Sequence, residues 1–460
     1  MLFNSVTFVL LHLLVLAAYW ASSSQSLRLF FVGLASVIFY GWFYWPGLLI
    51  IAASIIFNYF MALKIDHQRC KKWLSFAVIT NFLVLAYYKY ISFLAQSFVD
   101  LLAFININLE LPDTPQWLPL GISFFTFQIV AYLVDVYQKK IHAEKNFLIF
   151  TVFVSFYGQL IAGPIVRSHE FMPQLKKKLS FSARNMQLGF FFFITGLMLK
   201  VTVADTSAQF VDYGFSNIAS LQTHTAWATI YAFAIQILCD FWGYSTIALG
   251  SALMLGIKLP INFDSPYSSL SLREFWRRWH ITLSTWLRDY LYIPLGGNRK
   301  NTQRNLIITM TLGGFWHGAS WNFIIWGFLH GIWLATERIF ARRENFMLRR
   351  SFFIDLIKKL LVFHGVCLLW VFFRAQSFPD AMLYFKQLLL PPYTFTDPIP
   401  SALSSLIILF VLFNKKVGNL LVDDKFLSFS TTRQVSYTTA TILIILAYSQ
   451  ARLDFIYFVF

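Results

Sequence analysis

The tract GFWHGASWN, residues 314–322, lies inside a long apolar run that extends from about residue 306 to 340. It carries a histidine, His317, between glycines and tryptophans, and a run of this length predicts membrane depth. Imidazole titrates near neutral pH and can act as a general base. Ionisable side chains inside a membrane are functional candidates, because their desolvation must be compensated. His317 is therefore a candidate catalytic residue, and the alternative is a structural histidine bonded to a neighbouring helix.

The composition of the chain is that of a membrane protein. Of the 460 residues, 58% are hydrophobic and 13% are charged, whereas about 25% are charged in a soluble domain. Apolar runs recur along the chain, and at roughly 20 residues per spanning helix they predict about ten to thirteen membrane-embedded helices, some re-entrant or interfacial. We therefore predict an all-α polytopic membrane protein in which residues 1–460 form a single membrane-embedded domain.

Basic residues outnumber acidic ones by 37 to 21, which gives a net charge of +16. They cluster in loops beside the apolar runs, so the positive-inside rule places these loops in the cytoplasm and the N-terminus outside. Such loops suit anionic lipid headgroups as partners better than nucleic acid. The first apolar run has no basic residue before Arg28, which predicts a retained helix and no cleaved signal peptide. Cys70, Cys239 and Cys367 are scattered and indicate neither a disulfide framework nor a metal site.

A second candidate site is the segment SLREFWRRWHITLSTWLRDYLYIPLGGN, residues 271–298. Read as one helix, it places a polar and cationic stripe beside an aromatic face, and the stripe contains Arg273, Arg277, His280, Ser284 and Arg288. Such a helix lies near the membrane interface, where its arginines could bind lipid headgroups. They could equally bind the phosphates of a nucleotide thioester, so Arg277 and Arg288 are candidate substrate-binding residues. Lipid anchoring needs no imidazole, and His280 is therefore a second catalytic candidate.

His330 lies 13 residues after His317. On an unbroken helix this spacing corresponds to about 20 Å of rise and roughly 220° of rotation, so the two histidines are not expected to share one small site. Nearby glycines could break the helix, but they also favour His317 as the catalytic residue, because they allow close approach of a substrate. His330 stands among large aromatic residues and is expected to pack against a neighbouring helix.

Three more polar residues are candidate substrate contacts. Asp240 and Tyr244 lie in CDFWGYS, residues 239–245, within an apolar run, and Asn322 follows His317. An acid at that depth needs a partner, so Asp240 could orient a histidine or could pair with an arginine for structure alone. The tract GQLIAGPI, residues 158–165, predicts an interrupted helix, which membrane depth tolerates only where the interruption is buried or lines a cavity.

These tracts together resemble the membrane-bound O-acyltransferase family in its bacterial polysaccharide branch. That branch includes the membrane proteins of alginate and peptidoglycan O-acetylation and the D-alanyl transfer protein of teichoic acid. The similarity runs from about residue 118 to 375, in stretches that include residues 118–124, 160–167, 240–245, 262–267, 274–298, 313–318 and 373–375. The resemblance implies that the family's signature histidine is His317 and that its second histidine is His280. One position departs: where the alginate protein has an acid after Gly-Tyr-Ser, this chain has Thr246.

The C-terminal residues DFIYFVF, 454–460, resemble an aromatic tail found in this branch or in its small partner subunits. The resemblance implies that Tyr457 accepts an acyl group and passes it to an extracytoplasmic enzyme. A phenol is a plausible covalent carrier, because an aryl ester is a reactive acyl donor. The alternative is an interfacial tyrosine in an aromatic belt.

The resemblance implies a multi-pass O-acetyltransferase of the bacterial inner membrane that uses cytoplasmic acetyl-CoA as donor and has no bound cofactor. His317 would be the base and His280 would assist it. Acetyl would pass to Tyr457 or to a serine of a secreted or membrane-anchored extracytoplasmic acetyltransferase, which esterifies a polysaccharide, with peptidoglycan slightly favoured over alginate. Two alternatives stay open: a transporter or flippase of a lipid-linked precursor, and an acyltransferase that uses a long fatty acyl donor.

Overall fold

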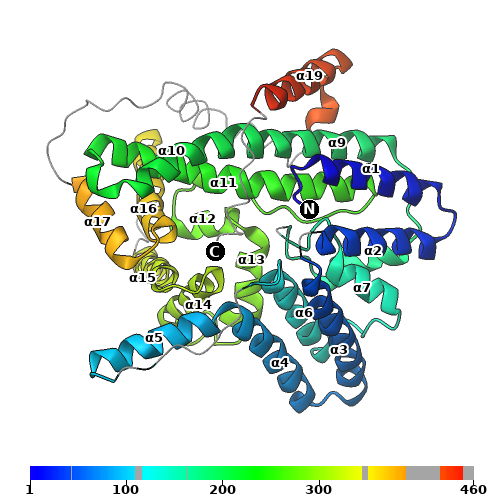
Figure 1. The fold of residues 1–460 in the computed structure, drawn as a ribbon, viewed down its shortest axis with the longest axis horizontal. Coiled ribbons are helices and arrows are strands. Elements are labelled where there is room, and N and C mark those ends of the chain that lie inside the picture. The colour runs from blue at the N-terminus through cyan, green and yellow to red at the C-terminus, as the bar shows by residue number, and fades with distance from the viewer. Residues whose placement is uncertain are drawn as a thin grey trace. The chain divides into compact units, whose positions relative to one another are not determined.

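The computed structural model describes residues 1–42, 44–107, 109, 117–161, 163–343, 351–389 and 425–448. Throughout these ranges the regular elements are helices (Figure 1), so the all-α prediction is confirmed. The described residues divide into two compact units, residues 1–190 with 248–260 and residues 191–247 with 261–460. The prediction of one domain over the whole chain remains a prediction.

Four of the described helices are long and apolar enough to cross a membrane: α3 (Pro46–Gln68), the continuous stretch Ala183–Ser216, α11 (Thr223–Met254) and α16 (Phe352–Arg374). A fifth span results if α4 (Lys71–Lys89) and α5 (Ile91–Phe104), bent by 66°, are taken together. The polytopic class is thus supported, but the described helices do not confirm ten to thirteen membrane-embedded helices. Three further apolar helices among those described are shorter than these spans: Val6–Ala21, Gln25–Gly41 and Ile122–Tyr137.

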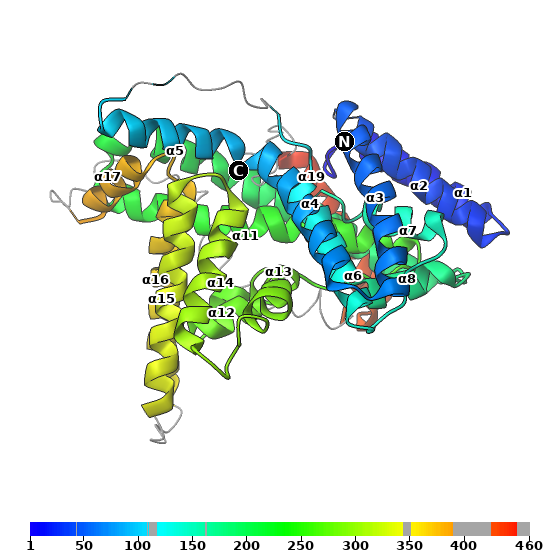
Figure 2. The ribbon, with the colours of Figure 1, turned by 90° about the horizontal axis from the view of Figure 1, so that it is seen from below.

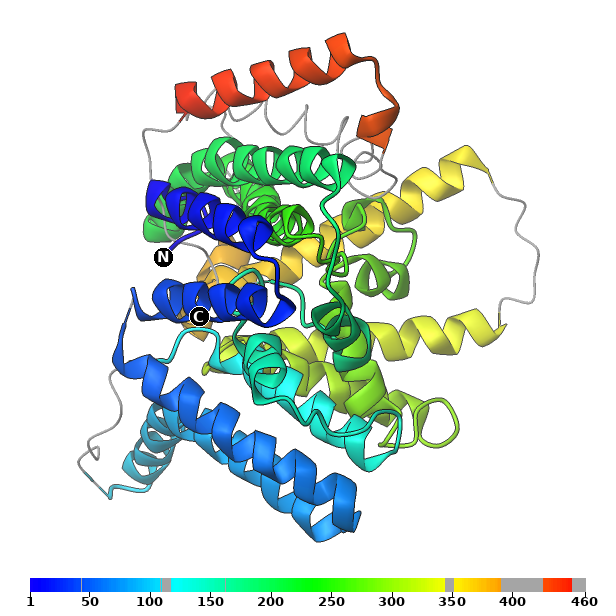
Figure 3. The same ribbon diagram turned by 90° about the vertical axis from the view of Figure 1, so that its right-hand side faces the viewer.

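The first unit is a group of helices around a strongly aromatic core. Its remaining helices are α1 (Val6–Ala21), α2 (Gln25–Gly41), α6 (Ile122–Tyr137), α7 (Phe147–Ser155), α8 (Ser168–Lys176) and the start of α9 (Ala183–Met198). Serine side chains at Ser5 and Ser24 accept backbone N–H groups and so begin α1 and α2. Helices α3 and α4 pack side by side, and they are the mid-blue helices at the lower left of Figure 3.

The predicted interruption at residues 158–165 is present in this unit. Helix α7 ends at Ser155, and residues 157–161 form turns. Gly121 lies against them in the left-handed region, with φ at 71°, and a Cβ on Gly121 would collide with the carbonyl oxygen of Leu160. The two tracts 118–124 and 160–167 therefore meet through backbone contact. Gln159 is buried there and donates to the carbonyl of Phe153.

The second unit contains the last part of α9, the π-helix η1 (Leu199–Ala204), α10 (Asp205–Ser216) and α11 as far as Ile247, with the short 3-10 helix η2 (Ile218–Ser220) between α10 and α11. The α9 and α11 backbones approach closely, since a Cβ on Gly196 would lie 2.6 Å from the carbonyl oxygen of Gly243. The elements that follow are η3 (Pro266–Ser268), α12 (Leu272–Arg278), α13 (Ile281–Leu287), the π-helix η4 (Arg288–Tyr292), α14 (Thr302–His317), α15 (Trp321–Arg343), α16, α17 (Phe378–Leu389), η5 (Lys425–Ser428) and α19 (Thr431–Tyr448).

Helices α14 and α15 form a closely packed pair joined by residues 318–320, and α16 packs on α15 (Figure 2). Small residues make the approach possible: a Cβ on Gly314 would lie 2.9 Å from the Cα of Gly327, and one on Gly331 would lie 2.7 Å from the Cα of Ile307. The break at residues 318–320 separates His317, the last residue of α14, from α15.

Candidate active site

The segment 271–298 is not the single helix that its periodicity predicted. It divides into α12, α13 and η4, and the division falls at His280, which has φ at 41° in the left-handed region. Few residues other than glycine adopt that conformation, so it ends the regular hydrogen bonding of the helix. The three tryptophans of the expected aromatic face, Trp276, Trp279 and Trp286, are all buried inside the unit.

The break also removes His280 from the cationic stripe. Arg277 and Arg288 are exposed, whereas His280 is fully buried. Its imidazole makes an edge contact with Phe241 of α11, with ring centroids 4.6 Å apart. Burial lowers the pKa of His280 to about 3, so this imidazole is neutral at physiological pH. The stripe prediction was wrong for His280, because it assumed one unbroken helix.

Asn262 holds the broken segment against α11. Its amide donates to Ser245 Oγ on α11 at 3.2 Å, and its Oδ1 accepts from the hydroxyl of Thr282 at 2.7 Å. Its backbone carbonyl accepts from the N–H of Ile281, the first residue of α13. Asn262 was not a candidate from the sequence, although it lies in a tract that resembles the family.

His317 ends α14 and is 4% exposed. Its imidazole is surrounded by the rings of Trp316, Trp326 and Phe373, with centroid distances of 5.0, 5.3 and 5.3 Å. The C-terminal end of a helix carries partial negative charge and favours a cation there. This placement suits a residue that becomes positively charged when it accepts a proton.

The prediction that His317 and His330 lie far apart was wrong. Because the chain breaks after His317, the two residues belong to different helices of a packed pair, and both contact the indole of Trp326. The indole of Trp316 contacts both His317 and His280, with centroids 5.0 and 6.1 Å away. The structure therefore brings all three histidines together around two indoles.

His330 is fully buried and accepts a hydrogen bond at Nδ1 from the indole N–H of Trp276, at 3.3 Å. The expected helix contact is thus present. Asn322, at the start of α15, is also buried and donates from its amide to the carbonyl of Ala375 at 3.0 Å. This bond ties α15 to the end of α16, so part of the Asn322 amide has a structural role.

Asp240 lies on α11 and pairs with a residue that sequence reasoning missed. Lys200 Nζ lies 2.8 Å from Asp240 Oδ1 and 2.7 Å from Asp205 Oδ1, and all three side chains are buried. The expected partner was a histidine or an arginine, and the structure supplies a lysine. A lysine inside an apolar run was the available signal. Tyr244, one helical turn beyond Asp240, is buried in α11.

The two arginine candidates lie on the surface of the unit. Arg277 is exposed on α12, and Arg288 begins η4, where it pairs with the neighbouring Asp289 at 2.7 Å. Both are accessible to a soluble ligand or to lipid headgroups. Tyr457 lies outside the described residues.

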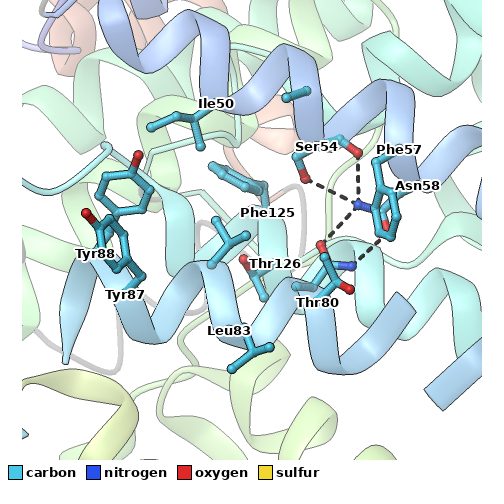
Figure 4. A pocket seen from close by; sticks show the side chains of 13 residues that line it. Ile50, Ser54, Phe57, Asn58, Thr80, Leu83, Tyr87, Tyr88, Phe125 and Thr126 are labelled. Atoms are coloured by element: carbon cyan, nitrogen blue, oxygen red, sulfur yellow. Dashed lines mark hydrogen bonds between the residues drawn. The ribbon is translucent and has the colours of Figure 1, made fainter. Parts of the chain in front are cut away.

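A separate cavity of about 550 Å³ lies in the first unit between α3, α4 and α6 (Figure 4). Asn58 and Asn81 form a reciprocal amide pair at its edge, at 3.0 and 2.7 Å, and each donates a second N–H to its own helix. Its other lining residues are mostly apolar, and none is an acid, a histidine or a cysteine. The titratable side chains that line it are the phenols of Tyr87 and Tyr88.

The profile of the membrane-bound O-acyltransferase family matches residues 137–375, which include His280, His317 and His330. The chain belongs to the membrane-bound O-acyltransferase family. The resemblance seen in the sequence is confirmed. This membrane-bound O-acyltransferase is therefore an enzyme, and the transporter alternative is not supported.

Three relatives of this membrane-bound O-acyltransferase illustrate the range of the family. A peptidoglycan O-acetyltransferase of Helicobacter pylori is 41% identical over 391 residues, which cover 77% of this chain and 72% of that protein. A probable alginate O-acetylase of Pseudomonas aeruginosa is 38% identical over 385 residues, or 82% and 72% of the two chains. A teichoic acid D-alanyltransferase of Streptococcus thermophilus is 31% identical over 277 residues, or 55% and 65%.

Proposed function

We propose that this membrane-bound O-acyltransferase takes acetyl from cytoplasmic acetyl-CoA and passes it across the bacterial inner membrane for O-acetylation of a cell-wall or extracellular polysaccharide. The names of the relatives support this reading, since they describe O-acetylation of peptidoglycan or alginate and transfer of D-alanine. These are small acyl groups, which favours acetyl over a long fatty acyl chain. Peptidoglycan is slightly favoured as the polymer.

The observation that carries the proposal is the placement of His317 at the end of α14 among aromatic rings and beside two further buried histidines. Acetyl transfer needs a base that accepts the proton of the attacking hydroxyl and returns it to the leaving thiolate. His317 would do both, so that the reaction needs no net proton. His280 would assist as a neutral imidazole that contacts the indole of Trp316.

The remaining candidates have supporting roles in this proposal. Arg277 and Arg288 are exposed and would bind the phosphates of the donor, because guanidinium groups bind phosphate oxygens bidentately. Anionic lipids are the alternative ligands of these arginines. The acceptor would be Tyr457 or a serine of an extracytoplasmic acetyltransferase, which then esterifies the polymer.

The test uses purified protein in lipid nanodiscs with acetyl-CoA and a soluble partner domain or a tyrosine peptide as acceptor. Release of free CoA thiol and appearance of acetylated acceptor are followed together. His317→Gln is expected to abolish both, with unchanged expression and unchanged donor binding. Full activity of His317→Gln would refute its assignment as the base, and full activity of Tyr457→Phe would refute the carrier role.

A further inference from the structure

The hydrogen bond between Trp276 and His330 determines where the proton of His330 lies. An indole N–H only donates, so His330 Nδ1 is the acceptor, and the neutral ring must carry its proton on Nε2. That Nε2–H group is buried and has no hydrogen-bond acceptor among the described residues. Buried polar groups are nearly always paired, so a donor in this position indicates a missing water or ligand oxygen.

Trp326 presents a second donor of the same kind. It lies four residues before His330, on the same face of α15, and the two ring centroids are 4.7 Å apart. Its Nε1–H is also buried and without an acceptor in the part of the chain that the structure describes. Neighbouring Trp370 differs, because its indole N–H donates to the hydroxyl of Tyr267 at 3.3 Å.

Trp326 links the two donors to the proposed base, because its ring contacts both His330 and His317. The ring of Trp326 contacts the imidazole of His317 edge to face, with centroids 5.3 Å apart and planes at 90°. Acyl transfer passes through a tetrahedral intermediate whose oxygen carries negative charge, and donors positioned for that oxygen stabilise the transition state. The indole of Trp326, in contact with His317, and the neighbouring imidazole of His330 each carry one N–H group of the kind that this step requires.

We propose that His330 and Trp326 form an oxyanion hole, in which His330 Nε2–H and Trp326 Nε1–H donate to the acyl oxygen, and that Trp276 positions His330 by fixing its tautomer. The inference rests on the proposed acetyl transfer. The acceptor hydroxyl oxygen bonds to the thioester carbon, and its proton moves to His317. The carbonyl π electrons become the oxyanion, which both donors stabilise. When the C–O double bond re-forms, the C–S bond breaks, and the thiolate takes the proton from His317.

The first test compares kcat and KM for acetyl-CoA. His330→Phe and Trp326→Phe keep a ring and remove a donor, and each is expected to lower kcat by about 10² to 10³ with little change in KM. His330→Gln retains an N–H donor and is expected to recover part of kcat. Trp276→Phe should give a smaller loss, because His330 remains but its tautomer is no longer fixed. Trp370→Phe is the matched control, since its N–H is already bonded, and should keep kcat.

The pH profile and an infrared measurement separate this role from a structural one. His330→Phe should lower kcat by the same factor at every pH, because the neutral imidazole only donates, whereas a change in the pH dependence would overturn the assignment. Bound carbonyl-labelled acetyl-CoA is then observed in His317→Gln protein, where no turnover occurs. Its carbonyl stretch should rise in frequency when His330→Phe or Trp326→Phe is added.

An unchanged stretch and unchanged kcat would overturn the oxyanion hole and leave ordered water as the occupant of the two donors. Loss of kcat in Trp370→Phe as large as in Trp326→Phe would also overturn it. A His317→Gln protein that still turns over acetyl-CoA would instead refute the proposed base, and absence of any bound acetyl-CoA would refute the proposed donor together with this inference.

Discussion

Replacing Lys200 tests the buried charge cluster most directly. Lys200 is 1% exposed, and its ammonium group pairs with two carboxylates, Asp205 at 2.7 Å and Asp240 at 2.8 Å. Lys200→Met leaves two buried carboxylates without that cation, and loss of one partner from a buried ion pair costs about 3–5 kcal/mol. Asp240→Asn leaves Lys200 paired with Asp205, so only one charged hydrogen bond is weakened, at a cost of about 1.5–3 kcal/mol.

The assay is the unfolding of purified protein in detergent micelles, followed by tryptophan fluorescence during a denaturant titration. Lys200→Met should unfold at a clearly lower midpoint than Asp240→Asn. Adding Asp205→Leu and Asp240→Leu to Lys200→Met should recover much of the loss, because apolar residues of similar volume can replace a buried ion cluster. Equal destabilisation by Lys200→Met and Asp240→Asn would refute this reasoning. Loss of acetyl transfer in Asp240→Asn with unchanged unfolding would instead assign Asp240 to the substrate, as the sequence suggested.

Three further predictions concern single elements. Burial lowers the pKa of His280 to about 3, so between about pH 6.5 and pH 3 the unfolded chain binds more protons than the folded chain. The free energy of unfolding therefore falls as pH falls through that window. His280→Gln should reduce this fall, measured as unfolding midpoints at several pH values. Asn58→Ala leaves the Asn81 amide without its partner and should cost about 1–3 kcal/mol, whereas Asn58→Leu with Asn81→Leu should cost clearly less in the same titration. Gly314→Ala puts a methyl group 2.9 Å from the Cα of Gly327. This substitution should destabilise the α14–α15 pair by about 1–3 kcal/mol. An unchanged melting temperature would show that the two helices can move apart without loss of stability.

Sequence periodicity succeeded where a helix is continuous and failed where the chain breaks. The grouping of Trp276, Trp279 and Trp286 on one face of residues 271–298 was predicted correctly, and the structure adds that all three are buried. The place of His280 was not, because a left-handed residue ends α12 and turns the imidazole away from the stripe. No spacing rule marks a histidine for that conformation, which Asn262 supports from outside the segment.

The same limit applies to His317 and His330. A separation of 13 residues placed them apart on one helix, yet the break at residues 318–320 reverses the chain and puts both against Trp326. Gly314 and Gly327 allow this close packing, but their effect depends on two helices that meet only after folding. The sequence marked the glycines as possible breaks and could not decide between a break and a packing contact.

The composition and the long apolar runs predicted an all-helical membrane protein, since 13% of the residues are charged here and about 25% are charged in a soluble domain. The motifs of the chain indicated its family. Tertiary structure alone decided which polar groups meet. In the π-helix η1 a backbone N–H bonds to the carbonyl five residues earlier, as Asp205 does to Lys200. The side chains of Lys200 and Asp205 therefore lie close together, and Lys200 also reaches Asp240 on α11. The break after His317 likewise gathers three histidines around two indoles. The reason is physical: local spacing specifies the faces of a continuous helix, whereas the partner of a buried polar group is set by the packing of distant segments and the cost of leaving that group unpaired.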